Sequence, residues 1–377
     1  MARAYPKDLV LRMYRSMYLI RRFEERAAQA YGQGKINGFC HLYTGQEAVA
    51  VGVTEAVRPT DYYITAYRDH GYALTRGADV GMVMAELFGR STGYSKGKGG
   101  SMHIYDIEHN VLGGYGIVGG QIPLAAGTAF ASRYRSEDRL TVCYFGEAAS
   151  NQGSFHETLN MAAKWKLPVL FLCENNRYGM GTAMERVSAV AEVYKRAVGY
   201  QMRGERVDGN DVFKVYEAVQ DCAAWCRAGK GPVLLEAETY RYRGHSMSDS
   251  ATYRRKEEVE TERKADAIPK LRAWATSAKV ASESDFDAVE AEVKATVDEA
   301  VKFADGSPVP SLEEVWTDHY VEPGERDIPP RERVHGAQVN WPKYPAGNEL
   351  QVTWDLEPRE PVKVGEPQPG LQKRAQS

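Results

Sequence analysis

Short, mostly apolar runs alternate along the chain with segments of helical periodicity, which is typical of an α/β fold. The runs at 62–65, 140–145, 169–173 and 233–237 are rich in β-branched and aromatic residues and predict buried parallel strands. Apolar residues spaced three and four apart predict helices over 8–31, from 154 to just before Pro168, 211–227 and 282–303. We therefore expect an open, mostly parallel sheet flanked by helices on both faces.

The stretch 140–178 combines a strand, a helix and a second strand, with polar residues at both strand exits. Leu140–Phe145 leads into Gly146 and Glu147, and Val169–Cys173 leads into Asn176. Ligands of open parallel sheets bind at the carboxyl ends of the strands. A carboxylate and an amide at that edge, beside a helix N-terminus, predict an oxygen site for Mg²⁺ that carries a diphosphate.

Two more predicted strands are followed by polar clusters. The run at 62–65 leads into Tyr67, Arg68, Asp69 and His70, and the run at 233–237 leads into the segment YRYRGHSMSD at 240–249. Polar clusters that directly follow a buried strand are often functional, because loops on a rigid scaffold carry most binding and catalytic residues.

Residues 93–127 contain ten of the 35 glycines, and we expect no helix or strand over 93–120. Within them Gly114–Gly119 matches the dinucleotide fingerprint GxGxxG, which indicates a nicotinamide cofactor only where it follows a buried strand. Residues 105–110 are too polar for such a strand. A nicotinamide-dependent dehydrogenase is therefore the less favoured alternative.

The bulk composition is that of an ordinary globular protein. With 43% hydrophobic residues, 26% charged residues and a net charge of −3, nothing favours nucleic acid or membrane as the main partner. No apolar run approaches the roughly 18–20 residues that a membrane-spanning helix needs. The five cysteines are an odd number and suggest reduced, buried thiols. These features predict a cytoplasmic protein.

The expected domain organisation has three parts. A helical arm over 1–37, able to reach a partner, precedes an α/β domain over 38–321. A Pro-rich tail over 322–377 follows, since nine of the 17 prolines lie in these last 56 residues. The highly charged segment 250–264 is expected at the surface.

Eight segments in a fixed order resemble the α subunit of the thiamine-diphosphate-dependent 2-oxo acid dehydrogenases, most closely the pyruvate dehydrogenase type. Besides the central stretch they are FCHLYTGQEA, YRDHG, GKGGSMH, GYGIVGGQIPLAAG, ENNRYGMGT, RVDGND and YRYRGHSMSD. The resemblance runs from about Met13 to Tyr320. It implies decarboxylation of pyruvate and transfer of the acetyl group to a lipoyl carrier, in a bacterial enzyme. Relatives acting on branched-chain 2-oxo acids or acetoin, and a degenerate non-catalytic subunit, remain alternatives.

The resemblance also implies how thiamine diphosphate is held. Tyr67 and Arg68 would contact the diphosphate, whose oxygens suit the planar guanidinium. Gly116 and Val118 would offer backbone groups to the aminopyrimidine ring. Ile117 would lie beneath the cofactor and keep it bent.

The same resemblance assigns the metal and the acid–base residues. Glu147 and Asn176 would bind Mg²⁺ through side-chain oxygens and Tyr178 through its carbonyl, while the amides of Ala148 and Ala149 would face the diphosphate. His41 and His245 would flank the reacting carbon and move protons, with His245 also contacting the cofactor. The partners that the resemblance implies are a β subunit in an α₂β₂ tetramer and the lipoyl domain of the acyltransferase core.

The chain departs from the family pattern at its centre. The usual Gly-Asp-Gly is Gly146-Glu147-Ala148 here. Glutamate adds one methylene and so about 1.5 Å of reach, whereas Mg²⁺ tolerates little error in ligand distance. Ala148 is harmless only if its φ is negative. We expect a retained but loosened metal site.

Overall fold

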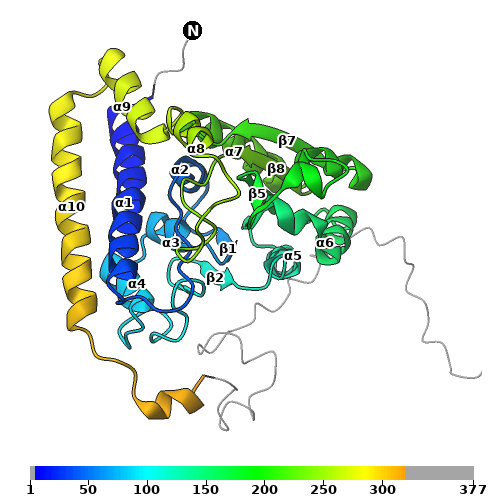
Figure 1. Cartoon of the computed structure of the whole chain (residues 1–377). Helices are drawn as coiled ribbons and strands as arrows, with labels where there is room; N and C mark the ends of the chain where they lie inside the picture. The colour runs from blue at the N-terminus through cyan, green and yellow to red at the C-terminus, as the bar shows by residue number, and fades with distance from the viewer. Residues whose placement is uncertain (1–4, 319–377) are drawn as a thin grey trace, which may run out of the picture. The chain divides into compact units, whose positions relative to one another are not determined.

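A six-stranded parallel sheet forms the centre of the computed structural model, which describes residues 5–318 (Figure 1). Its strand order is β2 (Val111–Tyr115), β1 (Tyr62–Ala66), β3 (Thr141–Gly146), β4 (Val169–Asn175), β8 (Val233–Glu238) and β7 (Arg203–Asp208). Every neighbouring pair is parallel. A short antiparallel ribbon, β5 (Tyr178–Gly179) with β6 (Thr182–Ala183), follows β4. The predicted α/β class is confirmed.

Helices connect and cover these strands. The α-helices are α1 (Lys7–Gly32), α2 (Glu47–Ala56), α3 (His70–Arg76), α4 (Val80–Leu87), α5 (Gln121–Tyr134), α6 (Gly153–Lys164), α7 (Val212–Arg227), α8 (Lys256–Arg263), α9 (Ala267–Ser277) and α10 (Glu283–Gly306). The short 3-10 helices are η1 (Glu147–Asn151), η2 (Met184–Arg186), η3 (Val193–Tyr200) and η4 (Leu312–Trp316). The four helices predicted from periodicity are α1, α6, α7 and α10, and all four are confirmed.

Both faces of the sheet are covered, as predicted. In β4, Leu170 and Leu172 belong to the hydrophobic cluster that also contains buried residues of α1, α2, α7 and α10. The alternating residues Val169, Phe171 and Cys173 belong to a second cluster with α5 and α6. Successive side chains of a strand point to opposite faces, so a strand with helices on both sides must be apolar throughout. This is why β4 and β3 could be recognised as unbroken apolar runs.

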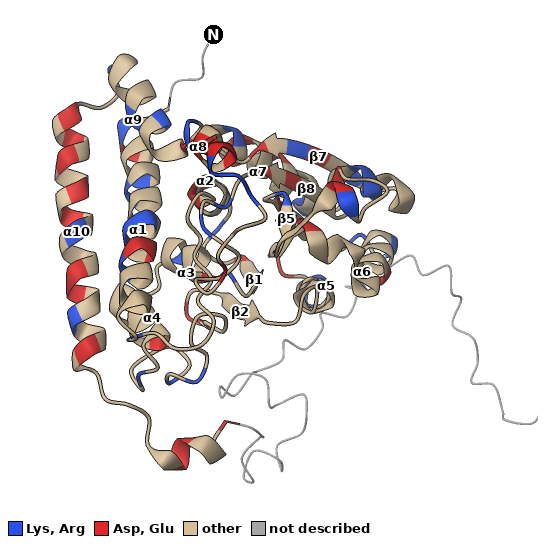
Figure 2. Ribbon diagram, viewed as in Figure 1, with Lys and Arg blue, Asp and Glu red and all other residues tan. Residues whose placement is uncertain are grey.

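Helix α1 is built into the main core. Its apolar stripe, which includes Val10, Met13, Ile20 and Phe23, is fully buried. Figures 1 and 2 show α1 beside α10, with acidic residues repeated along α10. The ion pairs between the two helices include Lys7–Asp285, Arg15–Glu292 and Arg26–Asp298. The chain through Thr317 forms one compact unit that includes α1. The expected division at residue 37 stays a prediction. The expected tail at 322–377 lies outside the described residues.

The expectation of no strand over 93–120 was wrong at Val111–Tyr115. This segment forms β2, an edge strand that pairs within the sheet only with β1. Gly113 and Gly114 lie in its centre, and Gly113 has a φ of +100°, so the composition argues against a strand. A strand therefore does precede part of the GxGxxG match. The polar residues at 105–110 do not by themselves exclude a dinucleotide-binding motif. The family comparison below decides that question instead.

A buried carboxylate organises the glycine-rich segment before β2. Glu86 Oε2 accepts hydrogen bonds from the N–H groups of Ser95 (2.8 Å) and Gly97 (2.9 Å). Its Oε1 accepts from Gly99 (2.7 Å) and Gly100 (3.0 Å). These bonds pair backbone donors that have no helix or strand to pair them. These bonds hold the irregular segment 95–100, which directly precedes residues 101–102, in one conformation.

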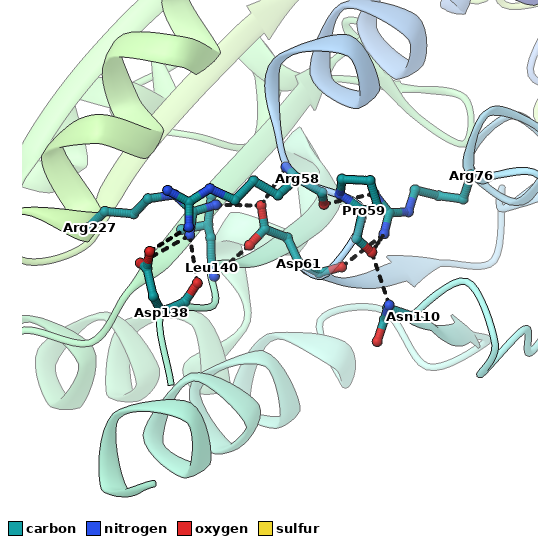
Figure 3. Close-up of polar contacts among 8 residues, drawn as sticks. All are labelled: Arg58, Pro59, Asp61, Arg76, Asn110, Asp138, Leu140 and Arg227. Carbon is teal, nitrogen blue, oxygen red and sulfur yellow. Dashed lines mark hydrogen bonds and ion pairs between the residues drawn. The ribbon is translucent and has the colours of Figure 1, made fainter. Parts of the chain in front are cut away.

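The amino ends of β1 and β3, at the edge opposite the polar strand exits, are joined by a second buried carboxylate (Figure 3). Asp61 is fully buried and accepts from the N–H groups of Arg58 (2.8 Å) and Leu140 (2.9 Å). Arg227 of α7 donates Nη2 to the same carboxylate at 2.5 Å. One side chain therefore ties two strands and a helix together.

We expect Asp61→Ala to lower the free energy of unfolding by about 3–5 kcal/mol, because it removes the buried acceptor of Arg227 Nη2 and leaves the N–H groups of Arg58 and Leu140 without their acceptor. Chemical denaturation measures the change. Asp138→Ala is the matched control, since Asp138 also pairs with Arg58 and Arg227 but its side chain is 64% exposed. The control should cost less than about 1 kcal/mol. Equal losses in both variants would contradict this account.

Candidate active site

The carboxyl ends of the strands surround one cavity of about 780 Å³. The chain continues from β1 to β2 on one side and from β3 to β4 on the other, so the strand order reverses between β1 and β3. Parallel sheets bind ligands at such switch points. The exits deliver Tyr67 and Arg68 from β1, Glu147 from β3, Asn176 from β4 and His245 from the segment after β8.

The structure brings together all the predicted site residues except Ile117. Those in the cavity wall are His41, Tyr67, Arg68, Gly116, Val118, Glu147, Ala148, Ala149, Asn176, Tyr178 and His245. Ile117 does not line the cavity, and its side chain is 79% exposed. Its place beneath a cofactor therefore stays a prediction.

The three predicted metal ligands lie along one side of the cavity. Asn176 Oδ1 and the Tyr178 carbonyl oxygen lie 3.3 and 3.2 Å from the same nitrogen, Nη1 of Arg241. Asn176 donates Nδ2 to Gln46 Oε1 (3.1 Å), which turns its Oδ1 the other way. Glu147 is buried, and its Oε1 has no hydrogen-bond partner. Within residues 5–318 no cluster of three His, Cys, Asp or Glu side chains could hold a metal ion, so a metal here needs the amide and carbonyl oxygens.

Arg241 is the main site residue that the sequence analysis missed. It is 1% exposed, and its Nη2 donates to the Met180 carbonyl (3.1 Å) and to Tyr253 Oη (3.0 Å). The signal was present, since two arginines directly follow the β8 run in the YRYRGH segment, but only His245 was singled out there.

A second guanidinium, that of Arg68, is buried at the same cavity. It donates to the carbonyl oxygens of Leu42 and His245, the latter at 2.8 Å. Burial, and then the charge of Arg241, lower the pKa of Arg68 to about 10. Two buried cations that disfavour one another's charge gain from an anion bound between them.

The two predicted acid–base residues face each other. The rings of His41 and His245 lie 5.1 Å apart, and the ring of Tyr67 lies 4.7 Å from His41. Burial and the charge of Arg68 lower the pKa of His245 to about 4 and that of His41 further still. Both imidazoles are therefore neutral at pH 7, and each can accept a proton and then return it.

Unpartnered polar atoms gather in this cavity. Most buried polar groups in proteins have a hydrogen-bond partner. Five buried side-chain atoms without one belong to cavity-lining residues: His41 Nδ1, Gln46 Nε2, Gln121 Oε1, Glu147 Oε1 and His245 Nδ1. Such a set indicates a cavity built around a polar ligand. Gln46 and Gln121 were not predicted.

Comparison with known proteins gives the family. The profile of the family described as "Dehydrogenase E1 component" matches residues 15–313, well over half of the chain. The chain belongs to the dehydrogenase E1 component family. The predicted family is thus confirmed. Because this family depends on thiamine diphosphate, the nicotinamide alternative is set aside.

Curated relatives of this dehydrogenase E1 component come from bacteria and from mitochondria. A Rhizobium meliloti protein named pyruvate dehydrogenase E1 component subunit alpha is 49% identical over 83% of this chain and 90% of its own length. A Zymomonas mobilis protein of the same name is 48% identical over 82% and 88%. The somatic mitochondrial form of Homo sapiens is 49% identical over 81% and 78%.

The departure from Gly-Asp-Gly takes a definite form in this dehydrogenase E1 component. Ala148 does not have a positive φ, so the methyl group brings no backbone strain. Its Cβ lies against Gly179, where an added Cβ would be only 2.6 Å away. Burial raises the pKa of Glu147, and hydrogen bonds from its own N–H and that of Asn176 oppose the shift. These backbone N–H groups favour the ionised form of the longer carboxylate.

Proposed function

We propose that this dehydrogenase E1 component is the α subunit of a pyruvate-decarboxylating enzyme, and that its cavity holds the diphosphate end of thiamine diphosphate with Mg²⁺. The observation that carries the proposal is that two buried guanidiniums, Arg68 and Arg241, share one cavity with Glu147, whose carboxylate oxygen Oε1 has no hydrogen-bond partner. A bound diphosphate would pair its negative charge with the two arginines. A bound cation would pair its positive charge with the carboxylate of Glu147. The bacterial and mitochondrial relatives named above are pyruvate dehydrogenases.

The residues present fit the metal ion. Mg²⁺ prefers oxygen ligands, and Glu147, Asn176 Oδ1 and the Tyr178 carbonyl are oxygen donors grouped on one side of the cavity. Arg68 would bind the diphosphate, and the amides of Ala148 and Ala149, at the start of η1, would add N–H donors. The remaining Mg²⁺ ligands would come from the diphosphate and water.

His41 and His245 are the residues that would move protons in this site. When bound, thiamine diphosphate supplies the nucleophilic carbon and the electron sink for loss of CO₂ from a 2-oxo acid. Because both imidazoles are neutral, either can donate an N–H hydrogen bond to a developing oxyanion, or accept a proton from a hydroxyl group and later return it. The chain thus contributes proton transfer and electrostatics, and a lipoyl domain would accept the acetyl group.

A β subunit would complete the site in an α₂β₂ tetramer. Large apolar side chains are exposed on α5, on the loop before it and on the neighbouring helix α6: Ile117, Leu124, Phe130, Tyr134 and Met161. Exposed apolar surface of this kind marks interaction sites. This surface adjoins the cavity through Val118 and Gly119, so a partner covering it would also close the cavity and give Ile117 a buried place.

A bacterial cytoplasmic location is part of the same proposal. Among the described residues, no helix has both the length and the apolar character that crossing a bilayer requires. The bacterial relatives, from Rhizobium meliloti and Zymomonas mobilis, agree with a bacterial enzyme.

We expect Glu147→Asp to tighten Mg²⁺-dependent binding of thiamine diphosphate by about tenfold, or about 1.4 kcal/mol, because it restores the shorter carboxylate of the family pattern. Calorimetric titration of the complex of both subunits measures the affinity at fixed Mg²⁺. Glu147→Gln is the control, since it keeps the length but loses the charge, and it should weaken binding. Weaker binding by Glu147→Asp would show that Glu147 has a role of its own.

A further inference from the structure

A buried histidine outside the cavity wall, His70, links helix α1 to the segment that carries His41. Its Nδ1 lies 3.0 and 3.1 Å from the two carboxylate oxygens of Glu24. Its Nε2 lies 2.9 Å from Ser101 Oγ and 3.0 Å from the Ser101 carbonyl oxygen. All three residues are buried, and none of them lines the cavity.

The acceptors around His70 make it a cation. The Ser101 carbonyl can only accept, so Nε2 must carry a proton. On the other side of the ring, both carboxylate oxygens of Glu24 face Nδ1. They can only accept a hydrogen bond, so Nδ1 carries a second proton. Burial alone would lower the pKa of His70, but the charge and hydrogen bond of Glu24, with the charge of Asp69, outweigh burial and raise this pKa. The ring is held as an imidazolium between two fixed partners.

The same two partners hold the backbone on both sides of Leu42. Glu24 Oε1 accepts from the N–H of Tyr43 at 2.8 Å, and Ser101 Oγ accepts from the N–H of His41 at 3.1 Å. The buried Nδ1 of His41 has no hydrogen-bond partner. Because no side-chain bond at Nδ1 fixes the His41 ring, its place in the cavity depends on this backbone.

We propose that His70 is a positioning residue for the reaction: clamped between Glu24 and Ser101, it fixes the backbone of His41 and so the place of that imidazole beside His245. The proposal rests on the proposed role of His41. Because His70 does not line the cavity, it acts on the reaction only through other residues.

The charge of His70 has a second, measurable effect on His41. Burial lowers the pKa of His41 most, followed by the charges of Arg68, His245, His70 and Arg241. A neutral side chain at position 70 removes one of these charges. The pKa of His41 should then rise toward its ordinary value, which a purely structural role of His70 would not bring about.

The test uses the complex of both subunits loaded with thiamine diphosphate and Mg²⁺. We expect His70→Gln to lower kcat by roughly ten- to a hundredfold, the range for a misplaced catalytic group. The KM for pyruvate and the affinity for thiamine diphosphate should change less than about threefold, since the diphosphate contacts remain. The pKa of His41, followed by titration of its ring, should rise toward its ordinary value.

Ser101→Ala should lower kcat similarly, and the double variant should lose no more than either single variant, because both act along one path. His109→Gln is the matched control: His109 forms the same kind of pair with Asp106 (2.7 Å), but it is 43% exposed and outside the cavity wall. It should leave kcat and the pKa of His41 unchanged.

Two results would overturn the proposal. One is an unchanged kcat in Ser101→Ala, which tests the path even if His70→Gln assembles poorly. The other is a double variant whose losses add. His41→Ala is measured in the same assays. If that variant is fully active, the proposed role of His41 is wrong, and the proposal for His70 falls with it.

Discussion

Replacing Arg68 with methionine is expected to weaken binding of thiamine diphosphate by roughly 10- to 150-fold, the equivalent of the 1.5–3 kcal/mol typical of a hydrogen bond to a charged group. The side chain is 7% exposed and already gives hydrogen bonds to the carbonyls of Leu42 and His245. Its position is therefore fixed before any ligand arrives, and its charge is the part of it that the protein leaves uncompensated. Loss of that charge should appear mainly in affinity.

Fluorescence or calorimetric titration of the complex with thiamine diphosphate and Mg²⁺ measures this effect. Arg68→Lys should give an intermediate loss, because it keeps the charge but not the planar fork that meets two phosphate oxygens. Arg58→Met is the remote control, since Arg58 pairs with Asp138 at the opposite edge of the sheet. An unchanged affinity in Arg68→Met would mean that the diphosphate is held elsewhere.

Replacing His41 with alanine is expected to lower kcat by about 10²–10⁴-fold, the usual contribution of a positioned acid or base. The imidazole is 5% exposed, lies 5.1 Å from the ring of His245 and has a pKa that burial lowers, so at pH 7 it is a neutral group able to transfer a proton. Binding of thiamine diphosphate should change less than about threefold, because the diphosphate contacts remain.

Single-turnover release of CO₂ from pyruvate, measured beside cofactor titration, separates chemistry from binding for this variant. His41→Gln is the informative companion, since its amide can donate a hydrogen bond but cannot exchange a proton at neutral pH. It should be nearly as slow as the alanine variant. A glutamine variant with full activity would restrict His41 to hydrogen bonding.

The strands that the sequence revealed are those buried on both faces. β3 and β4 are almost entirely apolar because helices cover them on each side, and β8 is also apolar apart from Glu236 within it and Glu238 at its end. β7 and β2 lie at the two edges of the sheet, and their sequences RGERVD and VLGGY have few apolar residues to mark them. Helix α8 has no buried residue, so its sequence has no periodic apolar stripe from which a helix could be predicted. Its charged segment was correctly expected at the surface.

The site could be predicted in part because each strand exit carries its own polar cluster. Arg241 escaped because its role depends on Asn176 and Tyr178, which are more than 60 residues earlier in the chain and meet it only in the folded structure. Gln46 and Gln121 lie in small-residue helical surroundings that resemble ordinary packing. Ile117 is the reverse case, a residue that was predicted but is exposed in the single chain. Its predicted role depends on a surface that a second chain would have to cover.

The most direct test of the central claim is pyruvate-dependent CO₂ release by this chain alone, by a candidate β chain alone and by the two together, with and without thiamine diphosphate and Mg²⁺. The account predicts activity only in the mixture with both cofactors present. Full activity of this chain alone would contradict the shared site. A stable complex that fails to bind thiamine diphosphate would instead identify this chain as a non-catalytic subunit.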